Sequence, residues 1–128
     1  MEAKGMDRKM KLYEEALQMQ DEIVALRREI HRHPEIGRKE FRTSKLIREK
    51  LAEFGVDEIQ SPVPTAVIGL IHGGKGAGRC VALRADIDAL PVTENTGLAF
   101  SSENEGVMHA CGHDTHAAML LCAAKVLC

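Results

Sequence analysis

The sequence predicts an α/β fold, because two helical patterns are followed by two short apolar runs and then by a last helical pattern. In the helical patterns, apolar residues recur every three or four positions, as they do on one face of a helix. The apolar runs between them are β-branched and bounded by glycines, which is typical of strands. A chain of 128 residues with 45% hydrophobic residues can bury one core, so we expect a single α/β domain.

The two helical patterns at the beginning of the chain have clear stop signals. The first covers residues 7–33, and Pro34 should end it because the residue before a proline is pushed out of the helical region. The second covers residues 40–54, where Gly55 supplies a left-handed stop. We therefore expect one long helix and one shorter helix, each with a polar face turned to solvent.

Two strands are expected in the middle of the chain. Residues 65–71 and residues 79–87 are apolar and β-branched, and the glycine-rich stretch 72–78 between them has turn composition. This predicts two paired strands joined by a loop. A phosphate-binding loop is disfavoured, because Lys75 is not followed by a Ser or Thr that opens a helix.

The last part of the sequence is predicted to be a loop followed by a helix. Residues 89–108 show little periodicity, and Asp114 is a good N-cap for a helix that continues to Cys128. The apolar pattern reaches the last residue without a closing glycine or proline. We therefore expect a truncated chain.

Composition excludes several classes of partner. The net charge is −2 and aromatic residues make up only 3%, which argues against nucleic acid as a partner. The charged beginning of the chain lacks a secretory signal, and no apolar run approaches the roughly 20 residues of a membrane span. We expect a cytoplasmic protein without membrane contact, with four reduced cysteines at positions 80, 111, 122 and 128.

The densest group of potential metal ligands is the stretch HACGHDTH, residues 109–116. Cys111 and His113 lie two positions apart and can reach one divalent ion, with Asp114 and His116 close by. The alternative is a capped helix with surface histidines and a buried thiol. Two ligands are fewer than the three or four of an ordinary zinc site, so the residues alone leave both interpretations open.

A second polar stretch, RADIDALP, ends the second predicted strand at residues 84–91. Asp86 and Asp88 are two positions apart, so both would face one side of a strand. Two neighbouring carboxylates at a strand end can be aimed at a metal ion. Taken alone, the stretch is more simply a solvated strand end with a turn at Pro91.

Three stretches carry a resemblance to a known enzyme family. Residues 26–51, residues 82–92 and residues 108–127 resemble hippurate hydrolases and related N-acyl-amino-acid amidohydrolases, in this order and spacing. These enzymes are similar to the plant indole-acetyl-amino-acid hydrolases and belong to the aminoacylase and carboxypeptidase superfamily of two-metal peptidases. The resemblance extends over residues 20–127.

The resemblance implies an α/β fold in which a mixed sheet is flanked by helices, as in zinc peptidases. Residues 1–128 would form part of the catalytic domain, while the lid or dimerisation domain and the C-terminal catalytic half would be absent. The implied activity is metal-dependent cleavage of the amide bond of N-acyl amino acids or short peptides. The implied cofactor is a pair of divalent ions, zinc or manganese, in an enzyme that is homo-oligomeric at full length.

The resemblance also assigns roles to residues. Cys111 and His113 match metal ligands, and Asp88 matches the catalytic aspartate that orients a ligand. Further residues near the site are Asp86, which stands where many relatives have a ligating histidine, Asp114 and His116. The general-base glutamate has no match in this chain, so the chain alone is expected to be inactive. The alternative is a noncatalytic fragment that binds metal weakly or not at all.

Overall fold

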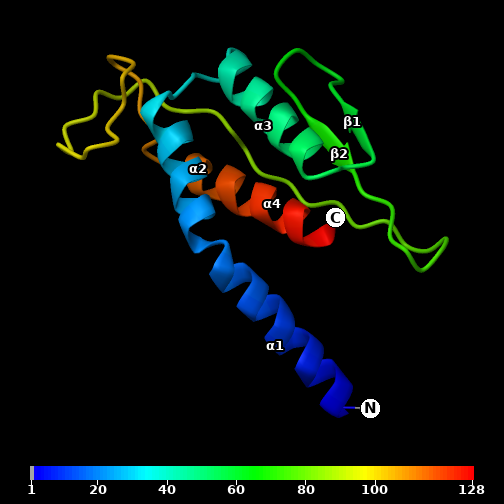
Figure 1. Ribbon diagram of the computed structural model, residues 1–128. Helices are drawn as coiled ribbons and strands as arrows, with labels where there is room; N and C mark the ends of the chain where they lie inside the picture. The colour runs from blue at the N-terminus through cyan, green and yellow to red at the C-terminus, as the bar shows by residue number, and fades with distance from the viewer. Residues whose placement is uncertain (1) are drawn as a thin grey trace.

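The computed structural model describes residues 2–128 of the chain, and side chains from residue 9 onward. Its elements in chain order are α1 (Glu2–Gln18), α2 (Gln20–Arg32), α3 (Phe41–Glu53), β1 (Glu58–Gln60), β2 (Ile68–Leu70) and α4 (His113–Leu127). Helices α2 and α3 flank α4, whereas α1 extends away from them (Figure 1). None of the helices in residues 2–128 has both the length and the apolar character that crossing a membrane requires.

The first predicted helix is two helices in the structure. The chain turns at Met19, whose φ of −89° and ψ of 2° separate α1 from α2. The prediction of one uninterrupted helix over residues 7–33 is therefore wrong. The apolar spacing continues through the turn, which is why periodicity alone did not reveal it. The predicted stop before Pro34 is confirmed, because α2 ends at Arg32.

Helix α3 agrees with the prediction to within one residue at each end. Gly55 follows it with a φ of +80°, the left-handed conformation expected of a glycine stop. The beginning of α3 is capped from a distance by Glu35. One carboxylate oxygen of Glu35 accepts the Arg42 amide at 3.0 Å, and the other accepts the Thr43 amide at 2.8 Å and the Thr43 hydroxyl at 2.9 Å. Glu35 thus helps to start the next helix.

The only two strands of residues 2–128, β1 and β2, form an antiparallel pair. Strand β2 lies inside the predicted strand 65–71, but its partner is β1 instead of residues 79–87. A side chain at Gly69 would come within 3.2 Å of Leu51 and Val56, so the glycine lets β2 lie close to the end of α3. The pairing of β2 with β1 is the one that covers the core at Leu51 and Val56.

Residues 79–87 are not a strand in the structure. The prediction of a strand there is wrong, because the segment pairs with no other segment in the part of the chain that the structure describes. Two of its large apolar side chains face solvent, with Val81 80% exposed and Leu83 61% exposed. The composition of this segment suits a strand, but no neighbouring strand in residues 2–128 pairs with it.

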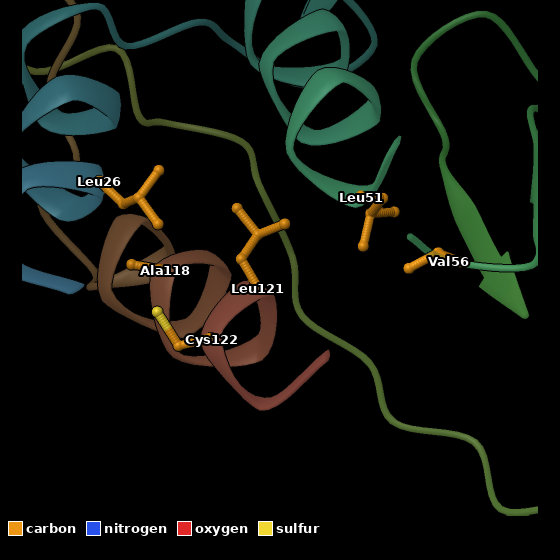
Figure 2. Close-up of a cluster of buried hydrophobic side chains, with 6 residues drawn as sticks. All are labelled: Leu26, Leu51, Val56, Ala118, Leu121 and Cys122. Atoms are coloured by element: carbon orange, nitrogen blue, oxygen red, sulfur yellow. The ribbon is translucent and has the colours of Figure 1, made fainter. Parts of the chain in front are cut away.

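The core lies between α4 and the other elements. Helix α4 contributes three small or branched side chains, α2 and α3 contribute one leucine each, and a valine follows α3 (Figure 2). These residues are Leu26, Leu51, Val56, Ala118, Leu121 and Cys122. Burial of this cluster fixes α4 against α2 and α3, and so places the residues at the beginning of α4.

The beginning of α4 differs from the prediction in one respect. The helix begins at His113, and its N-cap is Gly112 with a φ of +102°, which favours glycine. The expectation that Asp114 is the N-cap is wrong. The Asp114 carboxylate is fully buried and turned toward α2, where it meets basic side chains instead of the free amides of its own helix.

Candidate metal centre

Backbone pairing brings the RADIDALP and HACGHDTH stretches together. The Ala89 amide donates to the Glu35 carbonyl at 2.8 Å, beside a parallel bridge between Ile36 and Ala89. One residue further, Leu90 and Met108 exchange amide hydrogen bonds of 2.9 and 3.0 Å. These contacts fix the backbone directly after Asp88, next to the segment that leads into α4.

The side chains of Asp88 and His113 meet at this junction. His113 Nδ1 lies 2.9 Å from a carboxylate oxygen of Asp88 and 3.1 Å from its carbonyl oxygen. Because both oxygens accept, Nδ1 must carry the hydrogen in this arrangement, and Nε2 of a neutral ring keeps its lone pair. This is the form in which a histidine oriented by a carboxylate can bind a metal ion.

Cys111 and His116 flank His113 with side chains that are open to solvent. The Cys111 thiol is free and exposed, two positions before His113. The His116 ring centroid lies 6.1 Å from that of His113. In the described part of the chain, no three side chains of the types His, Cys, Asp and Glu come together in a way that could hold a metal ion. Cys111 and His113 are thus two candidate donors that are close in sequence.

Asp86 does not share the environment of Asp88. Its carboxylate forms an ion pair with Arg84, and its side chain is 46% exposed. The expectation that both carboxylates face one side rested on a strand over residues 79–87, which the structure does not contain. Of the two aspartates, Asp88 is the one that contacts a candidate ligand.

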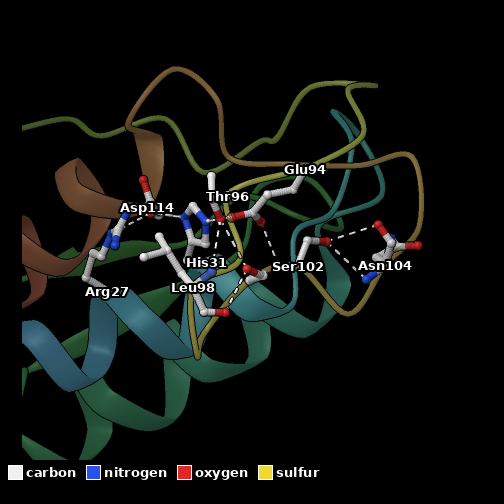
Figure 3. Close-up of polar contacts among 9 residues, drawn as sticks. Arg27, His31, Glu94, Thr96, Leu98, Ser102, Asn104 and Asp114 are labelled. Carbon is white, nitrogen blue, oxygen red and sulfur yellow. Dashed lines mark hydrogen bonds and ion pairs between the residues drawn. The ribbon is translucent and has the colours of Figure 1, made fainter.

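Asp114 belongs to a buried group of charged side chains that the sequence analysis did not identify. Its carboxylate lies 2.8 Å from Arg27 Nε and 2.8 Å from His31 Nδ1, and the other His31 nitrogen lies 3.2 Å from Glu94 (Figure 3). The sequence does contain a signal for it. Arg27 and His31 are four positions apart on a helix that is buried on one side, so both can reach the same partner.

His109 is also buried, with only 4% of its surface exposed. Neither ring nitrogen has a hydrogen-bond partner among the described residues. Loss of water around the ring lowers the pKa of His109, and the nearby Asp114 charge opposes this. A neutral ring is therefore favoured at this position.

Comparison with known proteins gives a consistent result. Residues 82–128 match the family described as peptidase family M20/M25/M40. Thermostable carboxypeptidase 1 of Saccharolobus solfataricus is 54% identical, over 95% of this chain and 31% of that protein. Hippurate hydrolase of Campylobacter jejuni is 45% identical, over 92% of this chain and 30% of that protein. The chain thus spans about a third of the length of these relatives.

A solved structure shares the fold as well. The crystal structure of a Bacillus subtilis protein, described as a dinuclear metal-binding peptidase from the M20 family, superimposes with a TM-score of 0.81 at 43% identity. The match covers 86% of this chain and 31% of that chain. The predicted α/β class and the predicted resemblance to N-acyl-amino-acid amidohydrolases are both confirmed.

Proposed function

Because this chain matches about a third of an M20-family peptidase in sequence and in fold, we propose that it supplies part of the active site of a metal-dependent amidohydrolase. The observation that carries the proposal is the hydrogen bond from His113 to Asp88, which leaves the second ring nitrogen available. In this proposal Cys111 and His113 are metal ligands, and Asp88 orients the His113 ring.

The donor types fit a divalent ion. A thiolate and an imidazole suit zinc, whereas manganese prefers oxygen ligands, so Cys111 favours zinc of the two candidate metals. A catalytic zinc site has three protein ligands, and no three candidate ligands come together among the described residues. We propose that the remaining ligands of a two-metal site, and the general-base glutamate, come from a part of the polypeptide outside residues 1–128.

The proposed reaction is hydrolysis of the amide bond that joins an acyl group to an amino acid. A divalent ion at this site would lower the pKa of a bound water and polarise the scissile carbonyl. The Asp88 carboxylate accepts the Nδ1 hydrogen of His113, which fixes the ring and raises the basicity of Nε2. Cys111, bound as a thiolate, would contribute negative charge to the site. Asp86, Asp114 and His116 stay near-site residues without a direct step.

Two substrate classes agree with the names of the relatives. A hippurate hydrolase acts on an N-acyl amino acid, and a carboxypeptidase acts at the end of a peptide. Both substrates present an amide next to an amino acid with a free carboxylate. We propose N-acyl amino acids as the main class and short peptides as the second. Four free cysteines suit a reducing compartment, which supports a cytoplasmic enzyme.

The ligand assignment can be tested with the metal alone. The chain is titrated with Co²⁺, because a thiolate bound to cobalt gives a charge-transfer absorption in the near ultraviolet. We expect Cys111→Ser to remove this absorption and to lower the zinc content measured by mass spectrometry after dialysis. The matched control is Cys80→Ser, which alters another exposed, free thiol. Equal cobalt spectra for wild type and Cys111→Ser would remove Cys111 from the site.

The role of Asp88 requires the complete enzyme. Asp88→Asn keeps the shape of the side chain and removes the charge that polarises His113. Loss of such an orienting partner typically lowers metal affinity or activity by about 10- to 100-fold. We expect kcat to fall by that factor, while Asp86→Asn, which changes an exposed carboxylate, leaves kcat near the wild-type value. Normal turnover in Asp88→Asn would contradict the proposed role.

A further inference from the structure

A buried polar cluster joins three segments of the chain beside the candidate metal centre. It consists of Arg27 and His31 from α2, Glu94 from the loop 92–102, and Asp114 from α4 (Figure 3). We propose that His31 is a positioning residue for the metal centre. It holds Asp114 in place, and through Asp114 it keeps the His113 ring in the orientation that donates to Asp88. The inference rests on the proposed function of His113 as a ligand.

The first contact of His31 fixes the beginning of α4. Arg27 Nε and His31 Nδ1 both lie 2.8 Å from the same oxygen of Asp114, which is fully buried. Arg27 also comes within 3.2 Å of His31 Nδ1. That contact is longer, and Arg27 already donates to the carboxylate, so Nδ1 is assigned as a donor to Asp114. A buried carboxylate with two donors on one helix is held firmly against that helix.

The second contact of His31 holds the loop 92–102. His31 Nε2 lies 3.2 Å from a carboxylate oxygen of Glu94. The other oxygen of Glu94 accepts the Ser102 amide at 2.6 Å, and the Thr96 hydroxyl donates to the first. Burial alone would raise the pKa of Glu94, but the hydrogen bonds from Thr96, Ser102 and His31 outweigh it and lower the pKa to about 2. Glu94 is thus a carboxylate at neutral pH.

An aromatic ring closes the cluster on one side. The Phe100 ring meets the His31 ring edge to face, with centroids 5.5 Å apart, and the Arg27 guanidinium lies 5.0 Å from the Phe100 centroid. These contacts restrict the His31 ring to one orientation, so Nδ1 stays directed at Asp114 and Nε2 at Glu94. The cluster is therefore a rigid connection between α2 and the beginning of α4.

The connection reaches the metal centre through one peptide bond. Asp114 directly follows His113, and both residues lie in the first turn of α4. The N-cap, Gly112, has no side chain that could fix this turn locally. The attachment of Asp114 to α2 thus adds a side-chain constraint on the first turn to the packing of the core residues of α4. Without it, the 2.9 Å hydrogen bond between His113 and Asp88 would lose its support.

The test measures the His113 ring in the metal-free chain. With ¹⁵N-labelled histidine at a pH of about 8, where an ordinary imidazole is neutral, NMR reports which ring nitrogen carries the hydrogen. The His113 signals are assigned by their loss in His113→Gln. We expect the Nδ1–H form in wild type. In His31→Gln we expect a shift of at least several-fold toward the Nε2–H form, which an unconstrained imidazole prefers.

The matched control is His33→Gln. It makes the same substitution two positions away, where the ring contacts the exposed carboxylates Glu29 and Glu103 at 3.6 and 3.7 Å. We expect wild-type His113 signals in this variant. If His31→Gln does not fold, Glu94→Gln replaces it, because that change keeps the size of the side chain and weakens one side of the cluster. The expected shift in Glu94→Gln has the same direction and is smaller.

The outcomes separate a positioning role from a structural one. A merely structural role would lower the urea midpoint of His31→Gln and leave the His113 ring of the folded protein in the Nδ1–H form. That result, or an equal shift in His33→Gln, would overturn the inference. Since the NMR measurement uses no metal, it can fail while cobalt still binds Cys111. Loss of the cobalt result with an intact NMR result would instead contradict the proposed function.

Discussion

The two segments that meet at the candidate metal centre are held in very different ways. The beginning of α4 is fixed by the core and by the buried polar cluster, and its Asp114 is fully buried. Residues 79–88 are mostly exposed, and regular backbone pairing starts only at Ala89. The position of the beginning of α4 is therefore set by contacts within this chain. The segment that leads to Asp88 is held by backbone pairing only at its end, from Ala89 onward. Paired substitutions in the two segments test this difference.

The largest contrast is expected between two aspartates. Asp114→Ala leaves the buried His31 and the part-buried Arg27 without their partner, and breaking a buried ion pair in this way typically costs about 3–5 kcal/mol. Asp86→Ala removes an exposed ion pair with Arg84, which should change stability by less than about 0.5 kcal/mol. Urea unfolding monitored by circular dichroism measures both. Equal losses would show that the polar cluster does not fix α4.

A second contrast compares two leucines. Leu121 is 3% exposed in the core, so Leu121→Ala should lower the free energy of unfolding by about 2–4 kcal/mol. Leu83 is mostly exposed, and Leu83→Ala should change it by less than about 0.5 kcal/mol. The same urea experiment applies. A large loss in Leu83→Ala would mean that residues 79–87 bury their apolar side chains in solution.

Elements defined by neighbours in sequence could be predicted, and elements defined by distant partners could not. Helix α3 and its glycine stop follow from local spacing, and both agree with the structure. The strand predicted over residues 79–87 was wrong, because apolar and β-branched composition shows that a segment suits a sheet and does not supply the neighbouring strand. The turn at Met19 interrupts no apolar pattern, so apolar spacing could not predict it.

The same limit applies to the candidate site. The resemblance led to Asp88 and His113, which meet in the structure as a hydrogen-bonded pair. Asp114 was expected to cap its own helix, an interpretation that uses only residues close in sequence. Its actual partner His31 lies 83 positions away, so only the folded chain reveals the pair. Local reasoning thus found a ligand candidate and missed the side chains that hold it in place.

A smaller effect is expected from acid. The folded-state pKa of Glu94 is lowered from 4.5 to about 2, so its ionisation stabilises the fold fully above about pH 5, and this contribution is lost as pH falls toward 2. Between about pH 5 and about pH 3, the loss should be on the order of 2 kcal/mol. The urea midpoint of unfolding, measured at several pH values, reports this loss. In Glu94→Gln the midpoint should depend less on pH over this range. Glu103→Gln, an exposed carboxylate on the same loop region, should keep the wild-type profile.

The last prediction concerns the hydrolytic activity of the chain alone, which should not be measurable. We expect no hydrolysis of hippurate or of other N-acyl amino acids by residues 1–128, even with excess zinc or manganese. Cys111 and His113 would supply two donors, and no group of three candidate ligands comes together among the described residues. A water bound there would also need a base to accept its proton.

The histidines outside the HACGHDTH stretch do not supply that base. His31 is occupied by two carboxylates, and both His33 and His72 contact glutamates on the protein surface. Chromatography of the reaction mixture, beside a control with the metal removed, measures cleavage directly. Metal-dependent turnover above the control would show that these residues already form a working site. Its absence, together with cobalt binding at Cys111, would agree with a chain that provides two ligands and their positioning residues without the catalytic base.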